Sequence, residues 1–136
     1  MPMFYSHQHI PAPEQRQRGQ AALELVGLAQ RADHHPNQLS GGQQQRVAIA
    51  RALVNQPRVI FADEPTANLD SASARTVMQT LRKLRDTLGV TVVFVSHDPD
   101  DAQYATQLIH LSDGRIAEDD TAAPAGGSHE VGAVRP

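Results

Sequence analysis

The sequence predicts an α/β fold with a mostly parallel sheet and flanking helices. Two apolar stretches, 58–63 and 90–95, have the length of strands, and the first reads as buried on both faces. Between them, residues 71–88 carry apolar side chains at helical spacing, and Gly89 follows as a terminator. A strand–helix–strand unit of this kind joins two parallel strands of one sheet.

The bulk composition limits the classes of protein. With 136 residues the chain holds one domain at most, and with 40% hydrophobic but only 4% aromatic residues its core is aliphatic. A net charge of −3 and a pI near 6.1 argue against nucleic acid as a partner. The sequence has no cysteine, no apolar run long enough to span a membrane and no visible signal peptide. We therefore expect a cytoplasmic chain.

A serine and two glycines precede a predicted helix at 42–55. Ser40 can cap this helix and still present its hydroxyl, while Gly41 and Gly42 let the backbone approach a ligand closely. The unpaired N–H groups and the dipole of a helix start attract anions. This stretch indicates a phosphate-binding site or, more simply, a capped helix start.

Polar residues follow both predicted strands. Asp63 and Glu64 end the first strand, and His97 follows the second, so the parallel connection places Glu64 and His97 at the same edge of the sheet. An aspartate there can hold Mg²⁺ through water, and the neighbouring glutamate can polarise a water molecule. The simpler interpretation is a pair of solvated acids and an ordinary histidine.

Four ordered motifs resemble those of ABC-type ATPases: LSGGQQQR at 39–46, RVIFADEPT at 58–66, NLD at 68–70 and VSHD at 95–98. They resemble that family's signature, Walker B segment, D-loop and switch histidine, and the resemblance covers roughly residues 2–118. The longer strings are most similar to exporters of the macrolide-efflux and lipoprotein-release type. Importer ATPases are the nearest alternative, and soluble ABC ATPases of translation or DNA repair form a second one.

The resemblance implies a head-to-tail dimer that buries ATP and Mg²⁺ between protomers and drives a transmembrane permease from the inner face of the plasma membrane. It implies catalytic roles for Glu64 and His97, and a magnesium site at Asp63 that binds the ion through water. It assigns contacts with the partner protomer's nucleotide to Leu39, Ser40, Gly41, Gly42 and Gln43. It assigns the D-loop to Asn68, Leu69 and Asp70, and Asp70 is also a good helix cap by itself.

The sequence contains no P-loop of the form GxxxxGK[ST], and its only lysine, Lys83, follows no glycine run. The resemblance therefore implies the C-terminal portion of an ABC ATPase domain, truncated at its N-terminal side. About 1–57 form the helical subdomain and signature helix, about 58–118 the rest of the catalytic core, and 119–136 a disordered tail. In this family the P-loop strand lies beside 90–95, so we expect an unpaired apolar edge there and a marginally stable chain that binds MgATP negligibly alone.

Two explanations of such a chain stay open. It is the rear part of a domain whose front half is encoded separately or was lost, or it is a non-catalytic fragment that offers its signature motif to a partner's ATP. Smaller expectations are a helix at about 14–31, a short helix capped by Asp98 and a hairpin through Asp113-Gly114. Arg46 is expected either to bind phosphate or to be a solvated helix residue. For the histidine pairs 7/9 and 34/35, solvated side chains are a simpler interpretation than a metal site.

Overall fold

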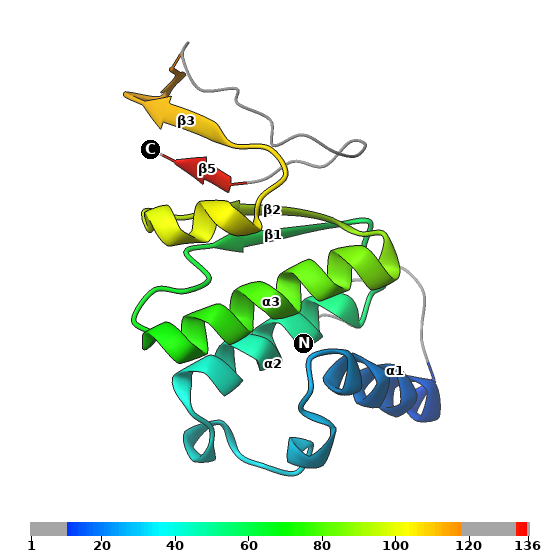
Figure 1. Cartoon of the computed structure of the whole chain (residues 1–136). Helices are drawn as coiled ribbons and strands as arrows, with labels where there is room; N and C mark the ends of the chain where they lie inside the picture. Colours follow the sequence, from blue (N-terminus) through cyan, green and yellow to red (C-terminus); the bar gives the residue numbers. More distant parts are fainter. Residues whose placement is uncertain (1–10, 118–132, 136) are drawn as a thin grey trace. The chain divides into compact units, whose positions relative to one another are not determined.

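The computed structural model of the chain describes residues 11–117 and 133–135 (Figure 1). Its internal contacts divide it into two units, Met1–Pro57 and Arg58–Pro136. Each unit has its own secondary structure and is considered separately. Part of the chain for which sequence expectations were made, including His7, His9 and most of the tail from 119, lies outside the described residues.

The first unit consists of two packed helices and two short turns of 3-10 helix. Helix α1 spans Ala12–Leu25 and contacts α2, which spans Gly41–Leu53, and the turns η2 and η3 lie at Ala29–Arg31 and Pro36–Gln38. The predicted helix at 14–31 is wrong at its C-terminal end, because α1 stops at Leu25. Gly27 has a φ of +73°, and the N–H groups of Gly27 and Leu28 donate to the carbonyls of Glu24 and Leu23. This pair of bonds is a Schellman motif, which closes a helix where a glycine adopts the left-handed conformation.

The second unit carries the sheet. Among the described residues the strands are β1 (Val59–Asp63), β2 (Thr91–Val95), β3 (Ile109–Ser112), β4 (Arg115–Ile116) and β5 (Ala133–Arg135). Their order across the sheet is β1-β2-β5-β3-β4, and every neighbouring pair is parallel except the β3–β4 hairpin. The hairpin turns at Asp113 and Gly114, both with positive φ, as the Asp-Gly sequence predicts. The predicted mostly parallel α/β fold is confirmed.

Strand β5 corrects two expectations about the sheet. The edge of β2 was expected to be unpaired, yet Phe94 and Val95 pair with Ala133 and Val134, and β5 pairs in turn with β3 (Figure 1). Residues 133–135 were also expected to be part of a disordered tail. The apolar Ala-Val dipeptide reaches the gap between β2 and β3 because a short strand there satisfies backbone groups on both sides.

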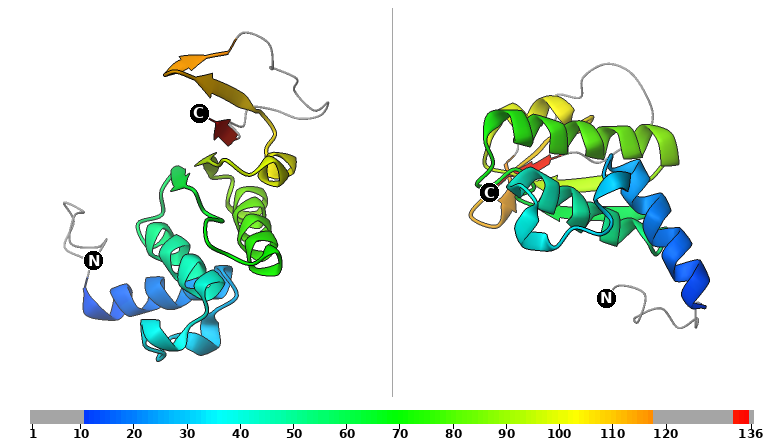
Figure 2. Two further views of the ribbon diagram at one scale, coloured as in Figure 1. Left: turned by 90° about the vertical axis from the view of Figure 1, so that its left-hand side faces the viewer. Right: turned by 90° about the horizontal axis from the view of Figure 1, so that it is seen from below.

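Helix α3 (Ser71–Leu88) lies along one face of the β1–β2 pair and contacts β2 (Figures 1 and 2). Its buried side comprises Val77, Met78, Leu81 and Leu84. Along β1, Ile60 is buried whereas Phe61 is 79% exposed, because successive side chains of a strand point to opposite faces. No described residue covers Phe61, although the sequence predicted a strand buried on both faces.

Helix α3 begins and ends at the residues that the sequence predicted as its caps. Asp70 caps its N-terminus by accepting a hydrogen bond from the Ser73 N–H, and Gly89 closes its C-terminus with a φ of +65°. The expected short helix after β2 is the 3-10 helix η4 (Pro99–Tyr104), and Asp98 caps it as predicted. Within the described ranges no helix has both the length and the apolar character needed to cross a membrane.

The buried stripe of α3 should dominate the stability of the second unit. Leu84 is 1% exposed and Leu88, one turn further along, is 44% exposed. We expect Leu84→Ala to lower the free energy of unfolding by about 2–5 kcal/mol, or to unfold the chain, because it leaves a cavity. Urea denaturation followed by circular dichroism measures this. The same substitution at Leu88 is the control, and an equal loss there would contradict the packing described.

Candidate functional site

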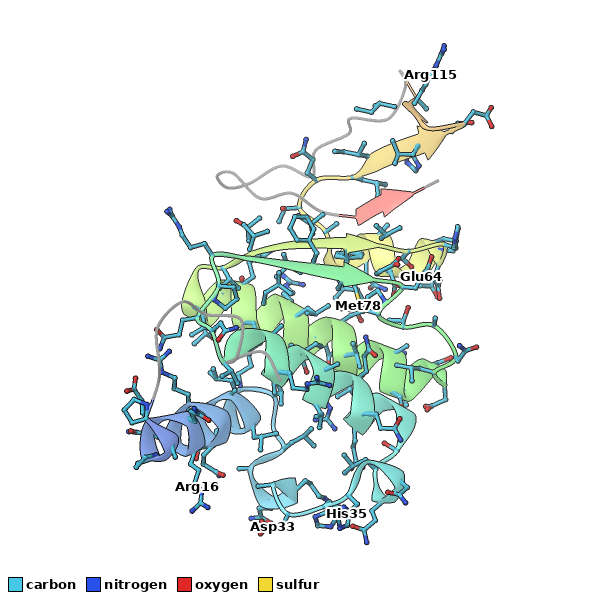
Figure 3. The ribbon with its side chains drawn as sticks, turned by 180° about the vertical axis from the view of Figure 1, so that it is seen from behind. Arg16, Asp33, His35, Glu64, Met78 and Arg115 are labelled. Atoms are coloured by element: carbon cyan, nitrogen blue, oxygen red, sulfur yellow. The ribbon has the colours of Figure 1, made fainter. Side chains whose placement is uncertain are left out.

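The carboxyl ends of β1 and β2 lie at the same edge of the sheet. The two strands are in register, with Val59 opposite Thr91 and Asp63 opposite Val95. The pairing extends one residue further, because the Glu64 N–H donates to the Val95 carbonyl over 2.8 Å. Figure 3 shows Glu64 just beyond the end of β1. Ligands bind at this edge in parallel α/β sheets.

Glu64 and His97 meet at this edge, as the sequence predicted. His97 Nε2 lies 3.1 Å from Glu64 Oε1. Glu64 is half-buried and His97 is 71% exposed. Although the two atoms are close, their alignment is not that of a hydrogen bond, and within the described structure the buried Oε1 accepts no hydrogen bond. The carboxylate therefore has acceptor capacity that the surrounding protein does not use.

The backbone of Glu64 is unusual for a residue with a side chain. Its φ is +45°, in the left-handed region, and Asn68 four residues later has a φ of +60°. The chain makes two successive tight turns here, with Ala67 N–H donating to the Glu64 carbonyl and Leu69 N–H to the Thr66 carbonyl. Non-glycine residues in this conformation occur often at functional sites, where the surrounding structure holds them. The turns lead directly into Asp70 at the start of α3.

A buried cluster lies next to this edge, and the sequence did not reveal it. Asp101 in η4 is 4% exposed, and its Oδ2 accepts hydrogen bonds from Thr66 Oγ1 at 2.7 Å and Ser96 Oγ at 2.6 Å. Ser96 Oγ also accepts a hydrogen bond from the Asp98 N–H. Thr66 and Ser96 belong to the DEPT and VSHD strings, but nothing in the acidic run 98–101 distinguishes Asp101 from its solvated neighbours.

In the first unit, the residues of the LSGGQ string form the start of α2. Ser40 is the N-cap: its Oγ accepts a hydrogen bond from the Gln43 N–H, and Gln43 Oε1 accepts one from the Ser40 N–H. This reciprocal pair is a capping box. Gly41 and Gly42 lie in the first helical turn, and neither is among the described residues with positive φ. Leu39 is half-buried, whereas Ser40 and Gly41 are exposed.

Arg46 makes a structural contact that argues against one of its two interpretations, that of a solvated helix residue. Its Nη1 donates to the Val26 carbonyl over 3.1 Å, at the C-terminal end of α1. The Nε of the same side chain is buried without a hydrogen-bond partner among the described residues. A cation at a helix C-terminus is favourable, and this contact joins α1 to α2. Arg46 is therefore not a solvated helix residue.

Asp63, the residue expected to hold Mg²⁺, is the exposed last residue of β1. An exposed carboxylate supplies the hard oxygen ligand that Mg²⁺ prefers, and exposure leaves room for the water molecules that the ion retains. Within the described ranges no group of three or more His, Cys, Asp or Glu side chains could hold a metal by itself. The donor set at Asp63 thus fits a largely hydrated ion.

A mostly parallel sheet with acidic residues and a histidine at the carboxyl ends of adjacent strands is the arrangement of a nucleotide-binding α/β domain. Comparison with known proteins narrows this class. The family model described as ABC transporter matches residues 2–67. An uncharacterized ABC transporter ATP-binding protein of Methanocaldococcus jannaschii is 54% identical over 103 residues, which cover 76% of this chain and 46% of that protein.

Two further comparisons agree. The macrolide export ATP-binding/permease protein MacB of Rhodospirillum rubrum is 50% identical over 133 residues, which cover 97% of this chain and 20% of that protein. The dimeric structure of the ATP-binding cassette MJ0796 in a post-hydrolysis state, bound to ADP and Pi, matches with a TM-score of 0.73 and 43% identity, covering 91% of this chain and 54% of that one. The chain belongs to the ABC transporter ATPase family, and it spans about half the length of the ATP-binding proteins it matches.

The cap of α3 makes a pH-dependent contribution to stability. Hydrogen bonds from the Ser73 side chain and then from the Ser73 N–H hold the pKa of the Asp70 carboxyl below its ordinary value. The unfolded chain therefore binds the proton at higher pH than the folded chain does, so this contribution is present above about pH 4 and is lost on further acidification. Asparagine also caps helices but does not titrate.

We expect the melting temperature of the parent chain to fall more steeply than that of Asp70→Asn as the pH is lowered from about 6 to about 3. Thermal denaturation followed by circular dichroism at a series of pH values measures the difference. Asp113→Asn, at the exposed hairpin turn, is the matched control. Parallel curves for the parent and Asp70→Asn would show that the cap does not depend on the carboxylate.

Proposed function

We propose that this chain is part of the ATP-binding subunit of an ABC-type exporter, in which ATP binding and hydrolysis drive transport through a membrane permease. The observation that carries the proposal is the 3.1 Å approach of His97 Nε2 to Glu64 Oε1 at the carboxyl edge of two adjacent parallel strands. The membership in the ABC transporter ATPase family supports the reaction, and the MacB relatives support export.

Glu64 is the residue we propose as the base that orients and polarises the attacking water. Its side chain is 31% exposed and its Oε1 accepts no hydrogen bond from the described protein, so the exposed part of the carboxylate can accept one from water. His97, being exposed and next to Glu64, hydrogen-bonds the γ-phosphate and couples the position of the phosphate to that of the carboxylate. The water attacks the γ-phosphorus in line, the bond to the β,γ-bridging oxygen breaks, and ADP and phosphate are formed.

Asp63 holds Mg²⁺ through a water molecule in this proposal. When bound, the ion neutralises charge on the phosphates. Asn68, Leu69 and Asp70 form the D-loop at the contact with the second protomer. The described turns support this role, since Asn68 and Asp70 are both exposed immediately after the Glu64 turn.

The signature residues Leu39, Ser40, Gly41, Gly42 and Gln43 serve the nucleotide of the other protomer in the proposed head-to-tail dimer. The capping box leaves the Ser40 O–H free to donate, because the hydroxyl oxygen only accepts from the Gln43 N–H. A helix start with a hydroxyl donor and N–H groups attracts a phosphate. The MJ0796 cassette, which resembles this chain, is dimeric in its ADP- and Pi-bound structure.

We further propose that the chain acts at the inner face of the plasma membrane, bound to a permease. The 136 residues contain no GxxxxGK[ST] sequence, so we expect this chain alone to bind MgATP negligibly. A non-catalytic role, in which the chain lends its signature motif to another protomer's ATP, is the second candidate. The start of α2 supports it, because Ser40 and Gly41 are exposed there and the capping box holds the helix start in place. ATPase activity from the pure chain would contradict both the expected weak binding and this second role.

A chimera tests the role of Glu64. This chain replaces the matched 103 residues of the Methanocaldococcus jannaschii relative, which supplies the remainder of the domain. We expect Glu64→Gln to lower kcat for ATP hydrolysis by about 100-fold or more, with little change in the Kd for MgATP, because a positioned base is lost while binding contacts remain. Steady-state phosphate release and calorimetry measure the two constants. Lys83→Ala, on an exposed face of α3, is the control, and unchanged hydrolysis by Glu64→Gln would rule out the proposed base.

An association assay tests the signature motif. The chain is mixed with the ATP-binding domain of Rhodospirillum rubrum MacB and a slowly hydrolysed MgATP analogue, and complexes are separated by size-exclusion chromatography. We expect association that depends on the nucleotide and is abolished by Ser40→Arg, which places a bulky cation where the phosphate would lie. Ser112→Arg, the same exposed substitution in β3, should associate normally.

The outcomes of this assay separate the two candidates. Association together with hydrolysis by the chimera supports the ATPase role. Association without any hydrolysis by the chimera supports the non-catalytic role. The absence of nucleotide-dependent association contradicts the function proposed for residues 39–43.

A further inference from the structure

Asp101 is the most buried charged residue of the second unit, and no motif or proposed catalytic role includes it. Its carboxylate binds two hydroxyl groups from separate segments: Thr66, in the turn after β1, and Ser96, at the end of β2. All three side chains are buried. Bonds of 2.6–2.7 Å between a hydroxyl and a carboxylate oxygen are short, as expected for charge-assisted hydrogen bonds.

The two hydroxyl groups flank the Glu64–His97 pair in sequence. Thr66 lies two residues after Glu64, and Ser96 directly precedes His97. The Glu64 backbone occupies the left-handed region, so the turn needs support from outside itself. The pair cannot supply that support, because His97 is 71% exposed and the contact with Glu64 is not aligned as a hydrogen bond.

We propose that Asp101 is a positioning residue: by binding Thr66 and Ser96 at once, its carboxylate fixes the turn that carries Glu64 to the strand end that carries His97. The Ser96 hydroxyl extends this support, because it accepts a hydrogen bond from the Asp98 N–H on the other side of His97. Residues on both sides of His97 are thus held, and so is the turn after Glu64. Asp101 thus adds to the support given by the bond from the Glu64 N–H to the Val95 carbonyl, although it touches neither of the two reactive side chains in the described contacts.

A carboxylate suits this role for a chemical reason. It only accepts hydrogen bonds, so both hydroxyl groups donate to it and their orientations are fixed. Asparagine retains one oxygen that can accept two hydrogen bonds, whereas leucine fills a similar volume and accepts none. Buried polar networks fix one arrangement when they are fully satisfied, and a partly satisfied network does not.

The test detects the contact between the Glu64 and His97 side chains by NMR and needs no nucleotide. The full chain is labelled with ¹⁵N-histidine, and the Nε2 chemical shift of His97 is measured at about pH 8, where an ordinary imidazole is neutral. A carboxylate beside Nε2 favours the tautomer protonated there, so Glu64→Gln should change this shift in the parent chain. In Asp101→Leu we expect the response to Glu64→Gln to fall to about half or less, because coupling between two residues depends on their contact.

Control variants separate positioning from general destabilisation. Asp100→Leu, at the exposed neighbouring position, should keep the full response, and Asp101→Asn should restore it by supplying an acceptor oxygen. A full response in Asp101→Leu, an equal loss in Asp100→Leu, or no restoration in Asp101→Asn would each overturn the inference. If Asp101→Leu does not fold, Thr66→Val removes one hydroxyl at constant shape and is expected to give the same loss, with a full response again overturning the inference.

The importance of Asp101 for catalysis rests on the roles proposed above for Glu64 and His97. The chemical-shift experiment does not depend on those roles, because it measures only the contact between the two side chains. A chimera that fails to hydrolyse ATP would contradict the proposed function and leave the chemical-shift result unchanged. A full response in the Asp101→Leu variant would contradict the positioning role even where the chimera is an active ATPase.

Discussion

The parallel pairing of β1 and β2 in register is the constraint on which the arrangement of polar residues depends. Because Asp63 lies opposite Val95, the residues that follow the two strands emerge at one edge of the sheet. The bond from the Glu64 N–H to the Val95 carbonyl then continues the ladder into the turn. A shift of the register by one residue would reverse the faces of one strand and separate Glu64 from His97. The proximity of Glu64 and His97 at this edge is therefore a consequence of strand register.

Residues around this edge divide into those that we propose to react and those that support them. Glu64 and His97 are accessible, and neither is fixed by a hydrogen bond between their side chains. Thr66, Ser96 and Asp101 are buried, and the hydroxyl groups of Thr66 and Ser96 both donate to Asp101. Such a division is physically reasonable, since a polar atom that already makes a structural hydrogen bond is less available to a ligand. In the other unit Ser40 combines both properties, because its oxygen accepts from the helix while its proton stays available.

Local sequence signals predicted the elements well wherever local physics decides them. The caps at Ser40, Asp70 and Asp98, the glycine stop at Gly89 and the Asp-Gly hairpin all arise from interactions within a few residues. The end of α1 was misjudged because apolar spacing continues past Gly27, although the glycine itself could have indicated a Schellman motif. Strand β5 could not be predicted, because a segment of three residues forms a strand only by pairing with β2 and β3, which are distant from it in sequence. Asp101 binds Thr66 and Ser96, which lie 35 and 5 residues before it in sequence, so no local sequence pattern predicts this cluster.

The left-handed backbone of Glu64 has a consequence for how such a molecule would respond to selection. Holding a glutamate at a φ of +45° costs on the order of 1 kcal/mol or more, whereas glycine adopts that conformation without a side-chain clash. A library screened only for resistance to heat would therefore enrich glycine at this position. The survivors would be more robust and would have discarded the carboxylate that we propose as the catalytic base.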